Sequence, residues 1–230
     1  MRKLILLSGL LCYFSALFAQ SVSTSDAGMW ATVSLQKNLS KRMDINFDQE
    51  LRLKENYQRI NLFYSNLGLS YKFSKNLKGE ISYRSIEKVG LDQTLSYRHR
   101  IQFDFTGKKK FGKFNLSHRI RYQIEMQDIY SSRKGKIPED FLRFKTEVKY
   151  ETGKFWTPYV SSEFRYQITA PRGKLLDYNF GFHRVRNILG IEFKLNDKST
   201  LNLYYVIQRE FDIARPENIY ITGIQYVFSF

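Results

Sequence analysis

The sequence predicts an all-β protein: an antiparallel up-and-down transmembrane β-barrel of about 10–12 strands, with short periplasmic turns and longer outer loops. Three observations predict this class. Apolar and polar residues alternate in segment after segment, short and longer connections take turns along the chain, and the last segment carries alternating aromatic residues. Alternation with a period of two places successive side chains on opposite faces of a strand. In a barrel of this class one face meets lipid and the other lines the interior.

The N-terminal segment indicates a secretory signal peptide. Arg2 and Lys3 precede an apolar run, and the small residue Ala19 follows it. The run is too short and wrongly flanked for a membrane-spanning helix. We therefore expect residues 1–19 to be cleaved and residues 20–230 to form a single outer-membrane β-barrel domain.

Composition excludes several kinds of chemistry. The only cysteine, Cys12, lies in the predicted signal peptide, so the mature chain has no disulfide, thiolate catalyst or cysteine-based metal site. Lys and Arg number 37 against 22 Asp and Glu, which becomes 35 against 22 without Arg2 and Lys3. Most basic residues alternate with apolar ones, which places the charge on strand faces and turns and does not predict a nucleic-acid partner. Aromatic residues make up 16 %, as suits the aromatic belts of a membrane barrel.

Eleven segments show the alternation, and helical spacing fits none of them as well. They cover residues 29–36, 43–53, 67–73, 80–84, 95–105, 114–125, 142–150, 160–168, 178–195, 201–210 and 220–230. The clearest segment places Leu95, Tyr97 and Ile101 on the face opposite Arg98 and Arg100. Most of these segments approach the ~9–11 residues that a tilted strand needs to cross an outer membrane.

The connections alternate in length. Short basic turns are expected at residues 38–41, 74–76, 107–112, 152–154 and 196–198, and longer loops at 55–59, 87–93, 127–140, 169–177 and 212–217. Outer-membrane barrels have short periplasmic turns and longer external loops, so the longer set is expected outside.

Eleven is an odd number, whereas bacterial single-chain barrels have an even number of strands and both ends in the periplasm. We therefore expect one segment not to cross the membrane, or residues 20–28 to add a strand or to thread the interior. A soluble antiparallel sandwich would also alternate apolar and polar residues. It is disfavoured because charge recurs on the polar face of strand after strand, behind a signal peptide and before a terminal aromatic strand.

The final segment is expected to carry the assembly signal. Tyr226, Phe228 and Phe230 share one face of a strand, and such an ending resembles the C-terminal motif that the barrel-assembly machinery recognises in outer-membrane proteins. The expected location is thus the cell outer membrane, and the expected partners are its lipids and the assembly machinery.

Five stretches carry a resemblance to a known family: Trp30, the run Asp48–Arg52, the block Leu67–Arg84, the segment Leu142–Tyr150 and the ending Gly223–Phe230. Together they resemble a small uncharacterised outer-membrane β-barrel family of Gram-negative bacteria, known as a domain of unknown function. The resemblance covers essentially the whole mature chain. It implies a fold and a location, and it supplies no activity.

An outer-membrane lipid hydrolase is the enzyme class to weigh, because two histidines fall on the expected lipid-facing side. His99 and His118 lie on neighbouring segments, and the hairpin between them is expected to bring them nearly opposite. A nucleophile would need to lie within hydrogen-bond reach. Ser96 and Ser117 point to the other face, and Ser85 is expected to pair several residues away from His99. We therefore expect no enzyme, and keep the hydrolase as an alternative.

Metal and cofactor sites are not expected. The three histidines are scattered, His183 stands near a strand start without any diagnostic neighbour, and no thiol accompanies them.

The expected interior face is rich in charge, with more basic than acidic residues. The candidates are Arg84, Arg98, Arg100, Arg119, Arg121, Arg143, Lys145, Arg165, Arg184 and Arg186, with Glu80, Asp104, Glu125, Glu147, Glu163 and Glu192 among them. Buried charges must be paired or wetted. Two interpretations remain open: a structural barrel plugged by ion pairs, because small barrels are narrow, and a narrow water-filled pore that prefers anions.

The longest connections supply a third possibility. Arg133, Lys134, Lys136, Arg172 and Lys174 lie in the two longest loops, where lipopolysaccharide phosphates would attract them. Solvated loop charge is the simpler explanation. The expected barrel is a monomer, and the sequence identifies no solute.

Overall fold

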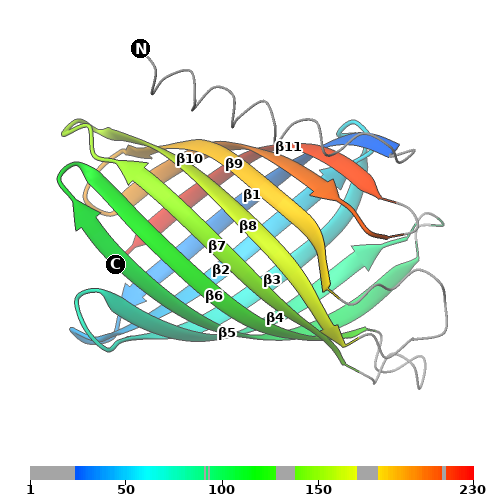
Figure 1. The fold of residues 1–230 in the computed structure, drawn as a ribbon, viewed down its shortest axis with the longest axis horizontal. Coiled ribbons are helices and arrows are strands. Elements are labelled where there is room, and N and C mark those ends of the chain that lie inside the picture. The colour runs from blue at the N-terminus through cyan, green and yellow to red at the C-terminus, as the bar shows by residue number, and fades with distance from the viewer. Residues whose placement is uncertain (1–23, 91, 93, 128–137, 170–180, 214–215) are drawn as a thin grey trace, which may run out of the picture.

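The chain forms a closed β-barrel in the computed structural model, which describes residues 24–90, 92, 94–127, 138–169, 181–213 and 216–230 (Figure 1). Its eleven strands are β1 (Thr24–Asn38), β2 (Met43–Lys54), β3 (Arg59–Lys72), β4 (Leu77–Val89), β5 (Leu95–Phe111), β6 (Phe114–Gln127), β7 (Glu139–Tyr150), β8 (Trp156–Thr169), β9 (Gly181–Lys194), β10 (Ser199–Glu210) and β11 (Glu217–Ser229). The all-β barrel and its predicted strand number are confirmed. No helix among the described residues is long and apolar enough to cross a membrane.

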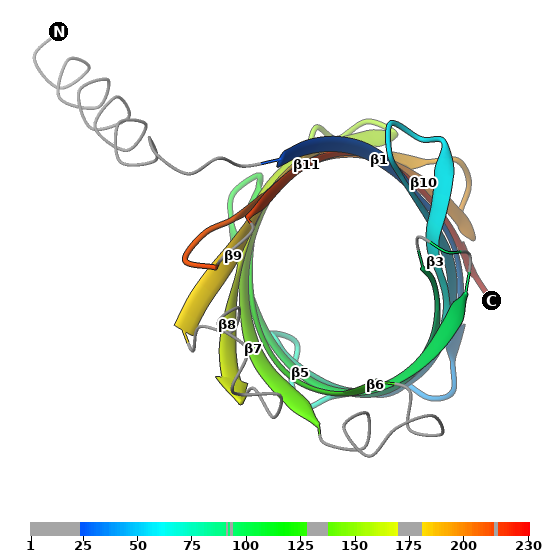
Figure 2. The same ribbon diagram turned by 90° about the vertical axis from the view of Figure 1, so that its right-hand side faces the viewer.

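Neighbouring strands are antiparallel everywhere except at the closure, where β1 and β11 run parallel. Figure 2 looks along the barrel and shows these two strands side by side in the ring. Their register runs from Thr24 opposite Glu217 to Gln36 opposite Ser229. The backbone N–H of Phe230 then donates to the carbonyl of Gln36 at 2.9 Å, which extends the parallel pairing by one residue.

The parallel closure corrects the expectation of an even strand number. When direction alternates around an odd number of strands, the first and the last point the same way, so the ring can close only through a parallel pair. The start of β1 and the end of β11 therefore lie at opposite ends of the barrel, not at the same end. Residues 24–28 neither add a strand nor thread the interior, because they form the beginning of β1. Residues 20–23 lie outside the described part of the chain.

The two ends of the barrel differ. At the turn end, defined by the connections after β1, β3, β5, β7 and β9, adjacent strands are joined within two to five residues. The opposite, loop end carries the other five connections. The predicted turn at residues 107–112 is wrong in extent, because β5 continues to Phe111 and only Gly112 and Lys113 form the turn. Gly112 takes a positive φ of 58°, which a glycine adopts without a steric penalty.

One connection at the loop end is shorter than its neighbours. Residues 55–58 join β2 to β3 with three consecutive positive φ angles, at Glu55, Asn56 and Tyr57. The carboxylate of Asp26 accepts the backbone N–H groups of Glu55 and Asn56 at 3.1 and 3.2 Å. The start of β1 thereby stabilises this turn.

The barrel is inside-out compared with a soluble protein. Gln102 and Gln123 are 0 % and 1 % exposed, whereas Leu189 is 62 % exposed. Successive side chains of a strand point to opposite faces. Because polar and apolar residues alternate, the polar side chains point inward and the apolar side chains point outward. Among the described residues, Val206, Ile219 and Ile221 on β10 and β11 form an apolar cluster in the interior.

A glycine lets an aromatic ring lie flat on the inner wall beside that cluster. A Cβ added at Gly223 would come within 2.1 Å of the Tyr204 ring on the paired position of β10. Any larger residue at 223 would displace the ring, and with it the packing of Tyr204 against the apolar cluster.

Candidate functional site in the barrel interior

The main interior cavity has a volume of about 610 Å³ and reaches the loop end of the barrel, where Lys54, Lys88 and Glu217 line it. Its described lining contains thirteen basic residues, Arg52, Lys54, Arg84, Lys88, Arg98, Arg100, Arg119, Arg121, Arg143, Lys145, Arg165, Arg184 and Arg186. Five acidic residues share that lining, namely Glu125, Glu139, Glu163, Glu210 and Glu217. The cavity is therefore strongly cationic.

A second cavity of about 390 Å³ lies at the turn end, lined by Lys75, Lys108, Lys149 and Glu147 among others. The two cavities share no lining residue, and the ion pair between Lys145 and Glu147, at 2.6 Å, crosses the boundary between them. Next to the second cavity, Lys110 and Asn115 donate to Glu151. The hydrogen bond from Lys110, and then that from Asn115, hold the pKa of the Glu151 carboxyl below its ordinary value.

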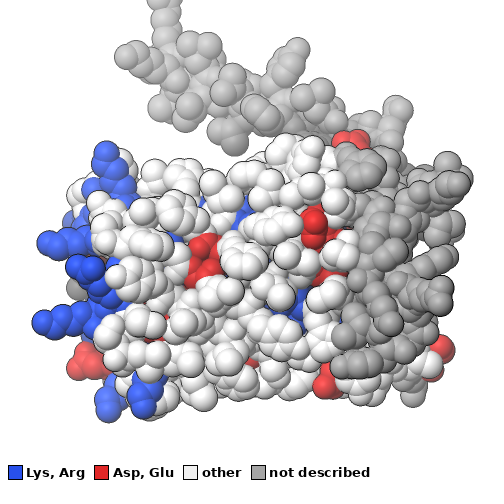
Figure 3. All heavy atoms as spheres, turned by 90° about the horizontal axis from the view of Figure 1, so that it is seen from below, with Lys and Arg blue, Asp and Glu red and all other residues white. Residues whose placement is uncertain are grey.

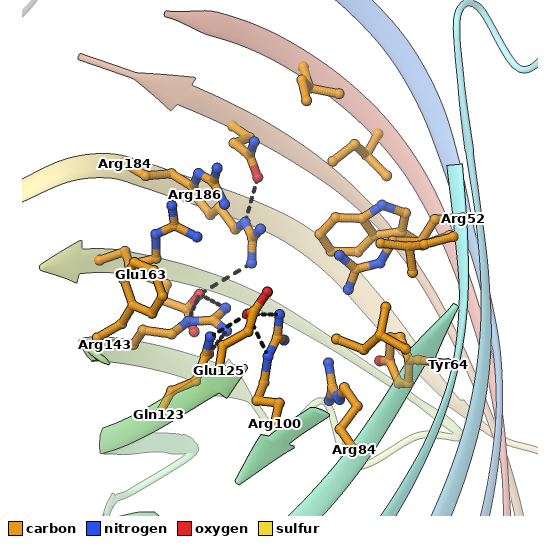
Figure 4. A pocket seen from close by; sticks show the side chains of 18 of the residues that line it. Arg52, Tyr64, Arg84, Arg100, Gln123, Glu125, Arg143, Glu163, Arg184 and Arg186 are labelled. Carbon is orange, nitrogen blue, oxygen red and sulfur yellow. Dashed lines mark hydrogen bonds and ion pairs between the residues drawn. The ribbon is translucent and has the colours of Figure 1, made fainter. Parts of the chain in front are cut away.

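Strand register builds the most cationic part of the large cavity. Arg121 on β6 lies opposite Arg143 on β7, Arg143 lies opposite Arg165 on β8, and Arg165 lies opposite Arg184 on β9. These four residues, here called the arginine ladder, form one row across four strands on the inner wall. Asp104 faces Arg121 at one end of the row and Glu210 faces Arg184 at the other. Figure 4 shows Arg143, Arg184 and Arg186 projecting into the cavity.

Interior carboxylates are shared between several guanidinium groups. Glu163 binds Arg143, and it also binds Arg119 at 2.7 Å and Arg186 at 3.6 Å (Figure 4). Asp104 accepts two hydrogen bonds from Arg121, at 2.5 and 2.6 Å, and lies 3.7 Å from Arg119. One negative charge thus serves two or three positive ones, and positive charge remains in excess.

The same sharing occurs toward the loop end. Glu125 binds Arg100 at 2.6 Å and Arg98 at 3.2 Å. Because a buried carboxylate is stable only when its lone pairs are satisfied, such shared pairs hold the interior side chains in fixed positions.

Arg84 and Arg165 differ from the other interior arginines. Among the described residues neither forms an ion pair with a carboxylate; the Nε of Arg84 donates to the side-chain oxygen of Asn66 at 3.3 Å, and that of Arg165 to Nε2 of His183 at 2.8 Å. Each guanidinium also lies over an aromatic ring, Arg84 over Tyr64 at 3.8 Å and Arg165 over Phe141 at 4.6 Å. Both groups are oriented but not neutralised.

The residues singled out from the sequence fall in three places. The nine candidate arginines and Glu163 line the large cavity, and Glu147 lines the second one. Tyr226, Phe228 and Phe230 lie on the outward side of β11 and its end, where Tyr226 and Phe230 are exposed. The loop residues Arg133, Lys134, Lys136, Arg172 and Lys174 lie outside the described part of the chain.

Two expectations about the histidines are wrong. His99 lies opposite Met126 and His118 opposite Gly107, so the two imidazoles are far apart in register. Ser85 pairs directly with His99 and not several residues away. The β4–β5 and β5–β6 turns are tighter than expected from the sequence, and a small change in turn length shifts the whole register. Nδ1 of His99 contacts the Tyr83 hydroxyl at 2.5 Å, and Nδ1 of His118 contacts that of Thr146 at 2.9 Å.

Sequence reasoning missed Trp30 and Tyr64, which line the large cavity, and His183, which holds one of its arginines. Trp30 points inward, and the guanidinium groups of Arg52 and Arg186 lie 3.9 and 5.2 Å from its ring. Tyr64 donates to Glu50 at 2.7 Å and supports Arg84. His183, which gave no signal in the sequence, holds Arg165. Strict alternation was the available signal for Trp30, because the apolar residues Val33 and Leu35 occupy the odd positions of the same segment and are exposed on the outside.

Among the described residues, no group of three or more His, Cys, Asp or Glu side chains is arranged to hold a metal ion. The chain matches, over residues 27–219, a family model described as a protein of unknown function, DUF2490. No curated protein shows significant similarity to the chain.

Proposed function

This chain belongs to the DUF2490 family of proteins of unknown function, and we propose that it acts as an outer-membrane β-barrel that provides a narrow passage for small anions. The observation that carries the proposal is the charge of the large cavity, whose described lining has thirteen basic residues against five acidic ones. A cavity wall of one dominant sign raises the local concentration of ions of opposite charge.

The distribution of apolar residues supports a membrane location. Side chains such as Leu67, Val160, Leu189 and Phe103 are exposed on the outside of the barrel, while the most buried residues include Ser34 and Gln102. Large continuous apolar surfaces are rare on soluble monomers. The strands are 12 to 17 residues long, which exceeds the ~9–11 residues that a tilted strand needs to cross a bilayer.

The turn end has the composition of a membrane interface. Phe73, Phe111, Phe114 and Phe155 are all more than half exposed there. Exposed lysines accompany them in and beside the same turns, at positions 41, 75, 108, 109, 110, 113, 154 and 198. Figure 3 shows the basic side chains gathered at this end, next to an outer face that is mostly uncharged. Aromatic rings and lysines in this arrangement suit the boundary between acyl chains and anionic headgroups.

The experiment compares anion and cation flux through the refolded protein, residues 20–230, in liposomes. We expect chloride efflux to exceed potassium efflux. The double variant Arg84→Gln/Lys88→Gln should reduce that preference, because neither side chain has a carboxylate partner among the described residues and no buried negative charge is left alone. Its control, Lys41→Gln/Lys113→Gln, removes the same charge at exposed turn positions and should change nothing. Equal chloride and potassium efflux in the unaltered protein would contradict the proposal.

A barrel that folds but passes no ions would instead favour a purely structural role. The plug would then be formed by the ion pairs of Glu163 inside the large cavity and by the Lys145–Glu147 pair, which joins the linings of the two cavities. A role for Arg133, Lys134, Lys136, Arg172 and Lys174 in binding lipopolysaccharide rests on their sequence position alone.

A lipid hydrolase is the second candidate, and one observation favours it. Ser85 and His99 are directly paired on the outward side of β4 and β5, where an acyl ester in the bilayer would be presented. A hydrolase of this kind would react with a fluorophosphonate probe and release fatty acid from phospholipid vesicles. Both signals should vanish in Ser85→Ala and persist in Ser162→Ala, whose hydroxyl binds Asn187 on the outside of β8. Absence of both signals in the unaltered protein would remove this candidate.

A further inference from the structure

The guanidinium of Arg165 is held in a fixed orientation, and its two terminal nitrogens remain available to a ligand. The Nε is engaged by His183 at 2.8 Å and the planar face rests on Phe141 at 4.6 Å, so the orientation of the guanidinium is fixed. The two terminal nitrogens make no hydrogen bond to any described residue and border the large cavity. In an arginine these nitrogens form the edge that binds oxyanions in a bidentate manner.

Arg186 lines the same cavity as Arg165, and its ion pair with Glu163 is long. Its Nε donates to Gln208 at 2.7 Å, and its nearest described carboxylate oxygen, on Glu163, is 3.6 Å from Nη1, beyond ordinary hydrogen-bond length. On β9 it lies two residues from Arg184, which faces Arg165. Diagonal neighbours two residues apart on adjacent strands are within reach of long side chains.

The positive charges of the arginine ladder destabilise the folded barrel unless a counter-ion offsets them. Like charges directly opposite on adjacent strands are destabilising, and the arginine ladder has three such contacts in succession. Asp104, Glu163 and Glu210 neutralise Arg121, Arg143 and Arg184. Arg165 is the member of the ladder that no described carboxylate neutralises.

We propose that Arg165 and Arg186 form a binding site for a phosphate-type oxyanion, which completes the charge of the arginine ladder. The inference rests on the proposed anion-attracting interior and names the chemical class that this interior selects. The two guanidinium groups carry two positive charges, which a dianion offsets and a monovalent chloride ion or carboxylate does not. A tetrahedral dianion has enough oxygens to accept from both edges at once. Inorganic phosphate and a phosphate monoester share this chemistry.

Trp30 supplies the readout, because Arg186 lies 5.2 Å from its ring. The chain has two tryptophans, so Trp156→Phe leaves Trp30 as the only one. In detergent-solubilised protein carrying this change, emission is followed during titration with inorganic phosphate, glycerol 3-phosphate, acetate and chloride. We expect saturable binding of phosphate well below the concentrations at which acetate and chloride act. If glycerol 3-phosphate binds as tightly as inorganic phosphate, the ligand is an organic phosphate. If glycerol 3-phosphate does not bind, the ligand is free phosphate.

Arg165→Gln should weaken phosphate binding about tenfold or more, as expected from the loss of a charge-assisted bidentate contact. The control is Arg98→Gln, which removes one positive charge from the same cavity. Glu125, the partner of Arg98, stays paired with Arg100 at 2.6 Å in this variant. Equal affinity of Arg165→Gln and unaltered protein, or a chloride affinity equal to that for phosphate, would overturn the inference. The titration measures phosphate binding and no ion flux. Phosphate binding can therefore be absent in a barrel that prefers anions, and it can be present in a barrel that passes no ions.

Discussion

The Nε–H of Arg165 donates to Nε2 of His183 at 2.8 Å, so the imidazole must be unprotonated at that nitrogen. Its other nitrogen, Nδ1, lies 3.3 Å from the carbonyl oxygen of Gly181 and can donate to it. A neutral histidine thus positions a charged arginine without neutralising it. A carboxylate in the same place would orient Arg165 equally well but would cancel its charge.

Replacing His183 tests this positioning role. His183→Phe keeps a ring in the same volume but removes the acceptor, so Arg165 loses its fixed orientation. We expect phosphate affinity, measured by Trp30 emission, to fall about three- to tenfold, in line with one neutral-acceptor hydrogen bond. Chloride-over-potassium preference should persist, because the cavity charge is unchanged. His118→Phe, on the outer face, is the control. Unchanged phosphate affinity in His183→Phe would show that the contact is only structural.

Glu163 is predicted to be the most important carboxylate for stability. It is 6 % exposed and binds three guanidinium groups, so Glu163→Gln leaves positive charges buried together. We expect a loss of about 3–5 kcal/mol in the free energy of unfolding, measured by urea titration in micelles. Glu217→Gln breaks a single pair with Lys54 in which the carboxylate is 43 % exposed, and should cost only about 0–1 kcal/mol. Equal losses in the two variants would contradict the shared-carboxylate account.

The parallel closure is testable by cross-linking, because the predicted mature chain has no cysteine. Ala31 on β1 pairs with Ile224 on β11. The double variant Ala31→Cys/Ile224→Cys should therefore form a disulfide on oxidation and resist unfolding in electrophoresis. The offset control pairs Ala31→Cys with Tyr220→Cys, four residues away along β11, or ~13 Å, which is too far for a disulfide. A disulfide in the control and none in the matched pair would contradict the register.

Phe230 is predicted to matter for assembly more than other exposed aromatics. Its ring lies 5.9 Å from that of Phe228 and 5.3 Å from the ammonium of Lys37, next to the hydrogen bond that ends the closure. Phe230→Glu should reduce the amount of heat-modifiable barrel in the membrane fraction of expressing cells. Phe155→Glu, at an exposed turn position, should have a smaller effect. Normal amounts of folded barrel in Phe230→Glu would argue against the terminal strand as the assembly signal.

Much of the fold could be predicted because strand periodicity depends only on neighbouring residues. Alternation around Arg98 and Arg100, for instance, gave the correct strand and the correct inward face. The direction in which the ring closes could not be obtained in this way. It depends on pairing between the first and last strands, which the alternation within each segment does not determine.

The candidate site was predictable in composition but not in arrangement. The sequence placed Arg165 inward without indicating that it lies opposite two other arginines, because a register error of one residue moves a side chain to the other face. The same uncertainty in turn length misplaced His118 relative to His99 and separated Ser85 from His99. His183 could not be identified as a partner of Arg165, since the contact joins residues from two strands across an unpredicted bulge.

The central claim, that the cationic interior provides a passage for anions, is tested most directly by single-channel recording. Refolded protein, residues 20–230, is inserted into a planar bilayer that separates two concentrations of KCl, and the reversal potential is measured. The account predicts discrete openings whose reversal potential has the same sign as the equilibrium potential of chloride. Openings that reverse on the potassium side, or a folded, heat-modifiable barrel that never opens, would contradict it.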